Sequence, residues 1–596
     1  MKGKFAMKIM KQKTYDTMKK FQDMFLRKFL LFAGILLVLL PACSEDVLDE
    51  TPLDFLAPEN AYQTLPGIKQ GITGLHFSVR QRWFYGTDQD AGAIIKGLGT
   101  DIAFHGEDPN STRFLCNYVN YVTSENTYLR NFWTWNYELI QRANVLVEGI
   151  NAADPNIWVK EGQKDAYLAE AMFFRAFAYR ILVSTYGDVP LVTEVIKGVK
   201  TDFVRTPKAQ VYAQMEQDLL FGTTKLPARG QEEEPGRITQ GAAWHMLSEC
   251  YLAQGKYQDA ADAATAVIDD YGYALMTERF GDRQNIVFGE GDPYYDLFDF
   301  GNQNIASNTE SIWVIQVEPP PTTGGGSVEG NRSFGPAYFR IGNTPDGFKA
   351  FRGEFRNGAY TGYSDTLGRP VAWIHPTNYA AYDIWESDWN TDVRNRKYNI
   401  KRNFYYDAPG SAYNKKKVNL LVDYAAQYAA GTRDAMRDSC QYIYPYWMKV
   451  ADPCHYFTDP NRSGGGSDHK DRYAIRLAET ILLRAEAYVG LNRPDLAAAD
   501  INLIRNRASA TPVDAADVDL DYILDERARE LYGEEWRHIT LRRMGKLVER
   551  VRLYNNNPKN PGLNIQDYHV LWPIPQNQID LNIDAEFPQN PGYPTR

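Results

Sequence analysis

The chain is poor in cysteine and in long hydrophobic runs. It has five cysteines in 596 residues, with neither a CxxC pair nor a Cys/His cluster at metal-ligand spacing, so a structural zinc site is not expected. The longest apolar run, Phe29 to Leu40, has twelve residues, whereas a helix that crosses a bilayer needs about 20. We therefore expect the body of the protein to lie outside the membrane.

Beyond the N-terminus, acidic residues outnumber basic ones. Residues 1–42 contain nine Lys/Arg and two Asp/Glu, so the remainder carries a net charge of −17 within a total of −10. An acidic surface repels phosphate backbones and anionic lipid headgroups. Nucleic acid is therefore not expected as a partner, and attachment to a membrane should come from a lipid.

The N-terminus has the order of a secretory signal. Two basic residues precede the apolar run, and Pro41-Ala42 precede Cys43. A cysteine at the cleavage point resembles a bacterial lipobox, whose thiol carries the lipid, although Pro41 is unusual there. An uncleaved anchor or a plain signal with an incidental cysteine is the alternative. Methionines at 7, 18 and 24 also leave the start codon open. The prediction is a signal peptide over 1–42 and a lipidated tether over 43–60.

The remaining cysteines have no metal-site pattern. Cys440 and Cys454 bracket a loop-like stretch and could form a disulfide in an oxidising envelope. Cys116 and Cys250 lie within apolar or helical patterns, which indicates buried thiols.

Helical periodicity dominates residues 61–272, apart from 83–127, which are rich in Gly, Asn and Asp and predicted to be loops. It is clearest in a repeat over 238–271. The residues that fit the tetratricopeptide pattern of two antiparallel helices are Trp244, Leu247, Ser248, Tyr251, Gly255, Tyr257, Ala260, Ala264 and Val267. A weaker second copy runs from Arg484 to Ala497, with Asn492 at the turn. We therefore expect a scaffold of antiparallel helix pairs.

The C-terminal region, residues 471–596, is also predicted to be helical. One long helix is expected from about Leu520 to Tyr554. It contains Glu526-Arg527 and Glu534-Glu535 close to further arginines. Such interleaved charges predict a solvated face with salt bridges along it.

Between these helical parts, residues 273–470 lose helical periodicity. Triple proline and triple glycine segments mark loops, and Ser311 to Val317 has the composition of a short strand. The glycine runs lack the Lys-Ser/Thr of a phosphate-binding loop. A loop-rich insertion of this length is usually functional, so we predict that it faces the ligand.

Several short sequence segments together resemble the SusD/RagB family of outer-membrane nutrient-binding lipoproteins. They are Tyr186–Val192, Arg237–Ala243, Arg472–Glu479, Leu571–Pro575 and Phe587–Tyr593. The resemblance runs from Cys43 to the C-terminus. It implies a mainly α fold of tetratricopeptide-like helix pairs, with short strands in the loop-rich insertion. It also implies a lipid-anchored protein on the cell surface, which binds a glycan and delivers it to a TonB-dependent, SusC-like outer-membrane transporter.

Ligand-binding residues of that family share no motif, so candidates must come from loop aromatics. Sugar rings present flat C–H faces that aromatic side chains cover, with polar groups at the rim. Each candidate could instead fill a small hydrophobic core beneath a loop. Tryptophans within helices, such as Trp133, Trp135 and Trp244, are expected in the core. The candidates are Phe104, His105, Asn117, Tyr118, Tyr121, Tyr294, Tyr295, Trp373, Tyr379, Tyr382, Trp385 and Trp389.

The predicted function is glycan binding without catalysis, with three alternatives. The same aromatic platforms could bind a peptide. A glycosidase would need two carboxylates about 5–9 Å apart; the acids near the tryptophans are Glu354, Asp383, Glu386 and Asp388, but no G-x-S-x-G or H-E-x-x-H motif is present. A scaffold that binds another protein's tail would leave the aromatic insertion unused.

No cofactor or metal is expected. Asp452, Asp459 and Asp468 could hold a structural calcium ion, but they lack the loop spacing of an EF-hand.

Overall fold

The computed structural model describes residues 15, 17–22, 24–26, 61–84, 89–107, 115–284, 289–317, 330–356, 358–364, 366–451 and 469–594. Tyr62–Arg596 form one compact unit and Met1–Ala61 another. Cys43, the predicted tether and Cys454 lie outside the described residues. Within the described ranges, no helix combines the length and the apolar character needed to cross a bilayer.

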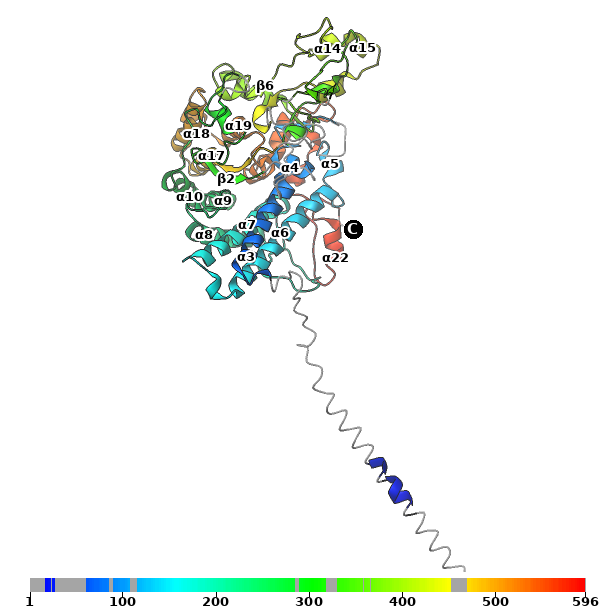
Figure 1. Ribbon diagram of the computed structural model, residues 1–596, viewed down its shortest axis with the longest axis vertical. Helices are drawn as coiled ribbons and strands as arrows, with labels where there is room; N and C mark the ends of the chain where they lie inside the picture. Colours follow the sequence, from blue (N-terminus) through cyan, green and yellow to red (C-terminus); the bar gives the residue numbers. More distant parts are fainter. Residues whose placement is uncertain are drawn as a thin grey trace, which may run out of the picture. The chain divides into compact units, whose positions relative to one another are not determined.

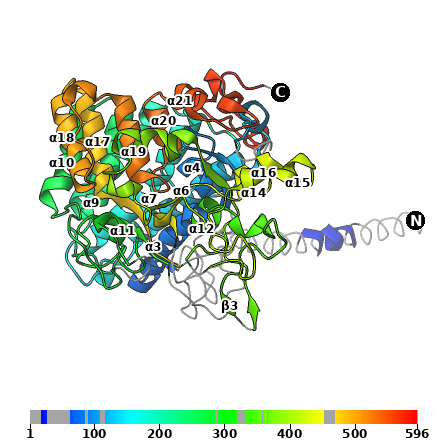
Figure 2. The ribbon, with the colours of Figure 1, turned by 90° about the horizontal axis from the view of Figure 1, so that it is seen from above.

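The larger unit is mainly α-helical (Figures 1 and 2), which confirms the predicted fold class. The helices of eight or more residues are α3 (Leu65–Val79), α4 (Gln89–Lys96), α6 (Thr127–Ala152), α7 (Gln163–Tyr186), α8 (Lys208–Lys225), α9 (Gln240–Ala253), α10 (Tyr257–Asp270), α17 (Leu477–Gly490), α18 (Pro494–Arg507), α19 (Leu520–Leu531) and α21 (Leu547–Tyr554). The shorter ones are α5 (Tyr118–Tyr121), α11 (Pro293–Leu297), α12 (Gly330–Phe334), α13 (Asn378–Ala381), α14 (Leu420–Asp423), α15 (Ala425–Ala429), α16 (Ala435–Gln441), α20 (Arg537–Arg543) and α22 (Gln576–Leu581).

Single helical turns and short strands connect these helices. The π-helical turn is η3 (Arg80–Phe84), and the 3₁₀ turns are η5 (Pro155–Ile157), η6 (Tyr338–Ile341), η7 (Asp383–Asp388), η8 (Val393–Asn395), η9 (Met448–Val450), η10 (Ala515–Asp517), η11 (Pro561–Asn564) and η12 (Asp567–Val570). The strands are β1 (Ala103–His105), β2 (Ser311–Ile315), β3 (Phe355–Arg356), β4 (Ala359–Tyr360), β5 (Ile374–Pro376), β6 (Ile400–Lys401), β7 (Tyr446–Trp447) and β8 (Arg472–Arg476).

The scaffold is a stack of helices in which each packs against the next. Helices α6 to α10 pack in chain order, and α17 and α18 continue the stack on α10. Both predicted repeats are therefore helix pairs, and they are neighbours although the whole insertion separates them in sequence. Gly255 and Asn492 take left-handed φ angles of 71° and 56° at the two turns. The Ser248 hydroxyl donates to the Ala260 carbonyl at 2.8 Å, because the small side chains let the paired helices approach closely.

The insertion leaves the scaffold after α10 and returns before α17. Strands β2 and β8 pair antiparallel and bring its two ends together. Three further antiparallel pairs, β1–β5, β3–β4 and β6–β7, brace the loops between them. In both ribbon views α14 and α15 lie on the side of the unit away from α10 and α18 (Figures 1 and 2).

The long helix expected from about Leu520 to Tyr554 is three helices instead. Gly533 and Gly545 take φ angles of 79° and 68° and turn the chain between α19, α20 and α21. Glycine adopts this left-handed backbone at no steric cost. Segments expected as loops between 83 and 127 also contain α4, α5 and β1.

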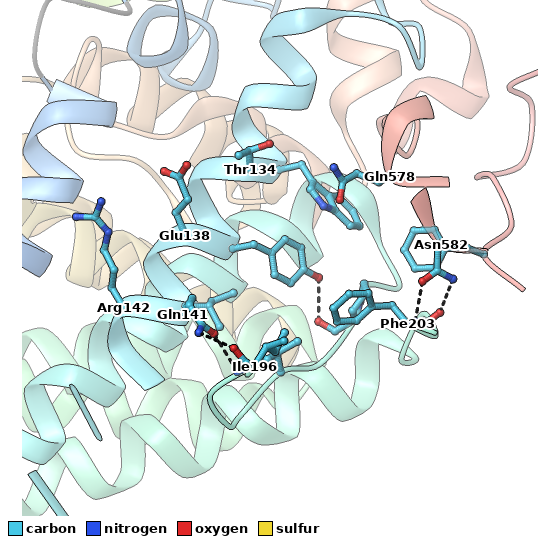
Figure 3. Close-up of a pocket in the computed structure, with 14 residues that line it drawn as sticks. Thr134, Glu138, Gln141, Arg142, Ile196, Phe203, Gln578 and Asn582 are labelled. Atoms are coloured by element: carbon cyan, nitrogen blue, oxygen red, sulfur yellow. Dashed lines mark hydrogen bonds between the residues drawn. The ribbon is translucent and has the colours of Figure 1, made fainter. Parts of the chain in front are cut away.

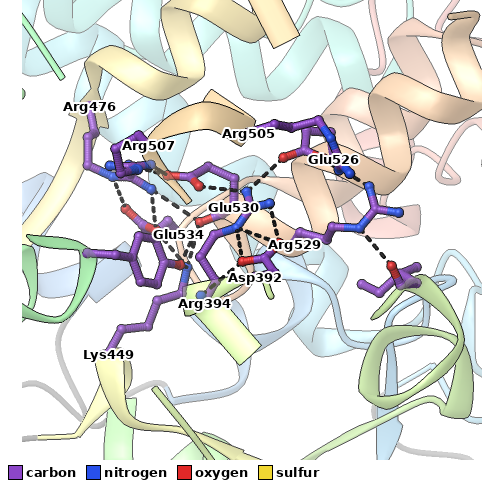
Figure 4. A network of polar contacts seen from close by, with 12 residues as sticks. Asp392, Arg394, Lys449, Arg476, Arg505, Arg507, Glu526, Arg529, Glu530 and Glu534 are labelled. Atoms are coloured by element: carbon purple, nitrogen blue, oxygen red, sulfur yellow. Dashed lines mark hydrogen bonds and ion pairs between the residues drawn. The ribbon is translucent and has the colours of Figure 1, made fainter. Parts of the chain in front are cut away.

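The charges of α19 are buried, so the expected solvated face is wrong. Arg394 of the insertion lies 2.7 Å from Asp392, 2.7 Å from Glu526 and 2.9 Å from Glu530, and all four side chains are fully buried (Figure 4). Burial alone would raise the pKa of the Glu526 carboxyl, but the surrounding arginines, Arg394 foremost, hold it at about 2. The charge pattern predicted ion pairs within the segment, such as those of Glu535 with Arg527 and Arg537. It could not reveal that Arg394 of the insertion covers and pairs with Glu526 and Glu530.

This group of ion pairs, the Glu530 network, joins the insertion to the scaffold (Figure 4). Asp392, Arg394 and Lys449 come from the insertion. Its other members come from β8 and helices α18 and α19, or follow α19 directly: Arg476, Arg505, Arg507, Glu526, Arg529, Glu530 and Glu534. A buried charge that loses its partner is costly, so the network fixes where the loops lie relative to the helices.

Candidate functional site

Most of the predicted ligand-binding aromatics lie in the protein interior. Phe104, His105, Tyr118, Tyr121, Tyr294, Tyr295, Tyr379 and Trp385 are all less than 9% exposed. These side chains present no ring face to solvent, so the structure places them in the core rather than on a ligand-facing surface. Trp133 and Trp135 are buried as expected.

The buried candidates hold the loops in place. The Tyr118 hydroxyl donates to the Gly99 carbonyl at 2.7 Å, and the Tyr294 hydroxyl donates to the Glu530 carbonyl at 3.0 Å. The Trp385 indole donates to the Ala380 carbonyl at 3.0 Å. Asn117 caps α5, since its side-chain oxygen accepts from the Asn120 amide at 3.2 Å. A buried polar group without a partner is costly, and these bonds explain the choice of Tyr, Trp and Asn.

Trp373 is different, because it is partly exposed and has charged neighbours. Its indole nitrogen donates to Glu107 Oε2 at 3.0 Å. The other Glu107 oxygen accepts from Arg340 Nη1 at 2.8 Å, and the Arg332 guanidinium lies 5.9 Å from the Trp373 ring centre. We call these four side chains the Trp373 corner. Glu107 and Arg340 have side chains 36% and 34% exposed, so their polar atoms are available at the surface.

Backbone pairing brings the corner together from distant parts of the chain. Trp373 directly precedes β5, which pairs with β1, and Glu107 follows β1 by two residues. The Gly106 amide donates to the Trp373 carbonyl at 3.2 Å. The Val371 backbone amide donates to the carbonyl of Arg332 in α12 at 2.9 Å. This bond brings α12 next to Trp373.

A second pair of exposed rings lies farther along the chain. Tyr382 and Trp389 are 42% and 40% exposed, with ring centres 6.3 Å apart and planes inclined by only 16°. Three of the twelve predicted aromatic or polar candidates, Trp373, Tyr382 and Trp389, thus present ring surface to solvent.

An apolar cavity of about 530 Å³ lies elsewhere, between α6, the segment 190–203 and the C-terminal segment (Figure 3). The Tyr137 hydroxyl donates to the Pro190 carbonyl at 2.8 Å. Asn582 and Phe203 exchange two hydrogen bonds, at 2.7 and 2.9 Å. The open surface of the cavity is mainly apolar, but polar and charged side chains also line it: Thr134, Glu138, Gln141, Arg142 and Gln578. We favour the Trp373 corner because it places a hydrogen-bond acceptor and a donor beside an indole ring on the loop-rich insertion.

Two family models match the sequence. One, described as "SusD family", matches residues 309–593, and the other, described as "Starch-binding associating with outer membrane", matches residues 96–252. The chain belongs to the SusD family. The family expected from the resemblance is therefore confirmed.

Individual relatives of this SusD-family chain agree with the models. SusD-like protein P25 of Formosa agariphila is 25% identical, and the match covers 94% of this chain and 97% of that protein. A SusD homologue from Bacteroides thetaiotaomicron has a TM-score of 0.66 at 21% identity, covering 92% of this chain and 100% of that one. A laminarin-binding SusD-like protein has a TM-score of 0.62 at 22% identity, covering 89% and 100%. These solved structures share the fold.

Sequence reasoning missed the charged residues of the Trp373 corner. Glu107, Arg332 and Arg340 were not among the candidates, because only aromatic residues and their immediate polar neighbours were considered. The available signal was proximity in sequence, since Glu107 stands two residues after the candidate His105. Arginine and glutamate are common at surfaces, so this signal is weak without the β1–β5 pairing.

The remaining predictions concern cysteine and metal. Cys440 is buried, but Cys454 lies outside the described residues, so their disulfide stays a prediction. The three aspartates considered for calcium also lie outside the described residues. In the ranges that the structure describes, no group of three or more His, Cys, Asp or Glu side chains is arranged to hold a metal ion.

Proposed function

We propose that this SusD-family protein binds a glycan at the Trp373 corner and does not cleave it. The observation that carries the proposal is a partly exposed indole bordered by exposed charged groups, on the insertion that the scaffold holds in place. The laminarin-binding relative and the starch-binding family description support a carbohydrate as the ligand class.

The chemistry of the corner suits a sugar ring. An indole face can cover the C–H face of a pyranose, while Glu107 accepts hydrogen bonds from ring hydroxyls and Arg340 donates to ring oxygens. The Glu107–Arg340 ion pair is about one third exposed. An exposed pair contributes little to stability, so its polar atoms can exchange partners with a ligand at low cost.

Asp388, one of the acids near the tryptophans, favours binding over hydrolysis. A glycosidase needs a general acid with a raised pKa. Asp388 is buried, which alone would raise its pKa, but hydrogen bonds from Thr511 and the charge of Arg505 lower the pKa to about 2. It therefore stays ionised and serves as a structural anchor for η7.

We further propose a lipid anchor at Cys43 on the cell surface, with delivery of the glycan to a TonB-dependent, SusC-like transporter. The N-terminal signal and the family description, which names association with the outer membrane, support this location. Replacing Cys43 by alanine should move the protein from the membrane fraction to the soluble fraction after cell lysis. Membrane retention equal to that of the wild type would count against a lipid on this cysteine.

Binding at the corner is tested by affinity electrophoresis in gels that contain laminarin, starch, xylan or pectin. We expect the wild-type protein to be retarded by at least one of them. Trp373→Ala should weaken that retardation at least tenfold, because the stacking surface and the hydrogen bond to Glu107 are both lost. Trp158→Ala is the control, since Trp158 lies between α6 and α7 and packs on Tyr167.

Two outcomes would contradict the proposal. Retardation of Trp373→Ala equal to that of the wild type would place the glycan elsewhere. A protein retarded by none of the four polysaccharides, but binding peptides in a peptide-library pull-down, would favour the peptide alternative.

A further inference from the structure

We propose that Tyr382 and Trp389 form a second sugar-binding platform, separate from the Trp373 corner, which stacks on another pyranose unit of the same polysaccharide. This inference rests on the proposed function and extends it from one binding site to two.

The relative orientation of the two rings distinguishes this pair. On the described surface, two ring pairs have both partners at least 40% exposed: Tyr382 with Trp389, and Phe355 with Tyr360. The second pair meets edge to face, at 64°, so its rings share no common plane. Tyr382 and Trp389 have ring centres 6.3 Å apart and planes inclined by only 16°, so the two rings lie nearly parallel and both keep exposed surface that a sugar can contact.

The 3₁₀ turn η7 adds acceptors beside the rings. Side chains three residues apart in a 3₁₀ helix lie one above the other, so Asp383, Glu386 and Trp389 share one side of the turn. All three are exposed. The Tyr382 hydroxyl makes no hydrogen bond within the described part of the chain. A pyranose on the rings would thus find free carboxylates and a phenol for its hydroxyls.

The opposite side of η7 fixes the platform to the scaffold. Asp388 lies 2.6 Å from Arg505 of α18 and accepts from the Thr511 hydroxyl at 2.7 Å. Arg529 of α19 donates to the Ile384 carbonyl at 2.7 Å. Because the turn is held by buried charged groups, the two rings need little ordering when a ligand binds, and such preorganisation favours affinity.

Arg402 fixes the orientation of the tryptophan. Its guanidinium lies 4.7 Å from the Trp389 ring centre and donates to the Ala381 carbonyl at 2.9 Å. The side-chain amide of Asn395 donates to the Trp389 backbone carbonyl at 2.8 Å. A cation over one face of the indole leaves the opposite face for the sugar.

The two sites have different neighbours. Trp373 contacts Glu107, which follows β1, and Arg332 of α12. Trp389 instead contacts Asn395 of η8 and Arg402, which follows β6. Two platforms on one molecule bind a long polymer by avidity, because the second contact is intramolecular once the first has formed.

The test compares four alanine variants in affinity gels that contain the polysaccharide retarding the wild type most among laminarin, starch, xylan and pectin. Trp389→Ala and Tyr382→Ala should each weaken retardation at least fivefold. Phe355→Ala and Tyr360→Ala remove rings that are at least as exposed but meet edge to face, and they should change retardation less than 1.5-fold. Thermal unfolding midpoints within 2 °C of the wild type would establish that all four variants are folded.

The outcomes separate this inference from the proposed function. If Trp373→Ala loses retardation while Trp389→Ala and Tyr382→Ala match the wild type, the second platform is overturned and the first site stands. Equal losses in all four variants would also overturn it, since any exposed ring would then suffice. If no polysaccharide retards the wild type, the proposed function fails, and the second platform fails with it.

Discussion

Arg394 has three carboxylate partners within 2.9 Å, and none of its side chain reaches solvent. An arginine can satisfy several carboxylates at once because its five N–H donors lie in a fixed plane. Removing it would leave Asp392, Glu526 and Glu530 buried with fewer cations to balance them. At the scale of single residues, the stability of the insertion therefore depends on a few arginines that a sequence search for ligand sites would pass over.

Arg394→Ala should lower the free energy of unfolding by about 3–5 kcal/mol, the usual cost of breaking a buried pair. Arg493→Ala is the matched control. Arg493 pairs with Asp495 at 2.7 Å, but both side chains are more than half exposed, so its removal should change the free energy of unfolding far less. Urea unfolding followed by tryptophan fluorescence measures both. Equal losses in the two variants would show that burial does not control the strength of these pairs.

At the scale of elements, the turn between α19 and α20 sets how closely the insertion meets the scaffold. Gly533 has a φ of 79°, and a Cβ atom there would lie 2.9 Å from Val450 Cγ1 of the insertion. Gly545 has a similar φ of 68°, but nothing lies within 4 Å of its Cβ position. The two glycines thus share backbone strain and differ in packing.

Gly533→Ala should destabilise the protein by about 1–3 kcal/mol more than Gly545→Ala, because overpacking adds to the common backbone strain. Thermal unfolding of the two variants beside the wild type measures the difference. If Gly545→Ala proved at least as damaging, close contact between the insertion and this turn would not limit stability.

The helix pairs were predictable because their periodicity is local. Gly255 and Asn492 stand at the turns of patterns that span about 30 residues each, and the structure places both in the left-handed region. The break at Gly533 was not predictable in the same way. A single glycine costs a helix only about 1 kcal/mol, so the helical pattern around Gly533 still predicted a continuous helix. The turn becomes evident only in the structure, from the φ of Gly533 and its close approach to Val450.

The candidate site was predictable as a region but not residue by residue. Trp373, Tyr382 and Trp389 are exposed, whereas neighbours with the same composition, such as Tyr379 and Trp385, fill the interior. Loop aromatics serve both roles, and long-range pairing such as β1–β5 decides between them. Ion pairs of the α19 region were predicted, but Glu526 pairs with Arg394 of the insertion and Arg505 of α18, which lie far from it in the sequence.

At the scale of the whole molecule, buried charges make stability depend on pH. Burial alone would raise the pKa of the Asp101 and Glu170 carboxyls, but Arg537 and Arg237 respectively lead the groups that lower both to about 2. Burial also lowers the pKa of His245 and His538 to about 3. The carboxylates thus stay ionised, and the two histidines stay neutral, over most of the pH range.

The direction in which stability changes with pH follows from comparing these pKa values with those of the unfolded chain. Unfolded carboxylates have pKa values near 4 and unfolded histidine has one near 6.5. As pH falls from about 6.5 towards 3, the unfolded histidines take up protons that the buried ones do not, so the folded protein loses stability. The carboxylates cause a similar loss from about pH 4 towards pH 2. We expect the thermal unfolding midpoint to fall between pH 7 and pH 5, and more steeply below pH 4. A midpoint that stays constant from pH 7 to pH 3 would contradict this account of the buried charges.

The fold and the site combine into one arrangement for the whole molecule. Stacked helix pairs form the scaffold, the Glu530 network fixes the insertion on it, and the insertion presents the Trp373 corner and the Tyr382–Trp389 pair at the surface. The cavity beside α6 belongs to the same unit.

The most direct measurement is a crystal structure of the protein grown with an oligosaccharide of the glycan that retards it most. The account predicts a pyranose ring stacked on the Trp373 indole, with hydroxyls bonded to Glu107 or Arg340. A sugar bound only in the cavity between α6 and segment 190–203, with the Trp373 corner empty, would contradict it.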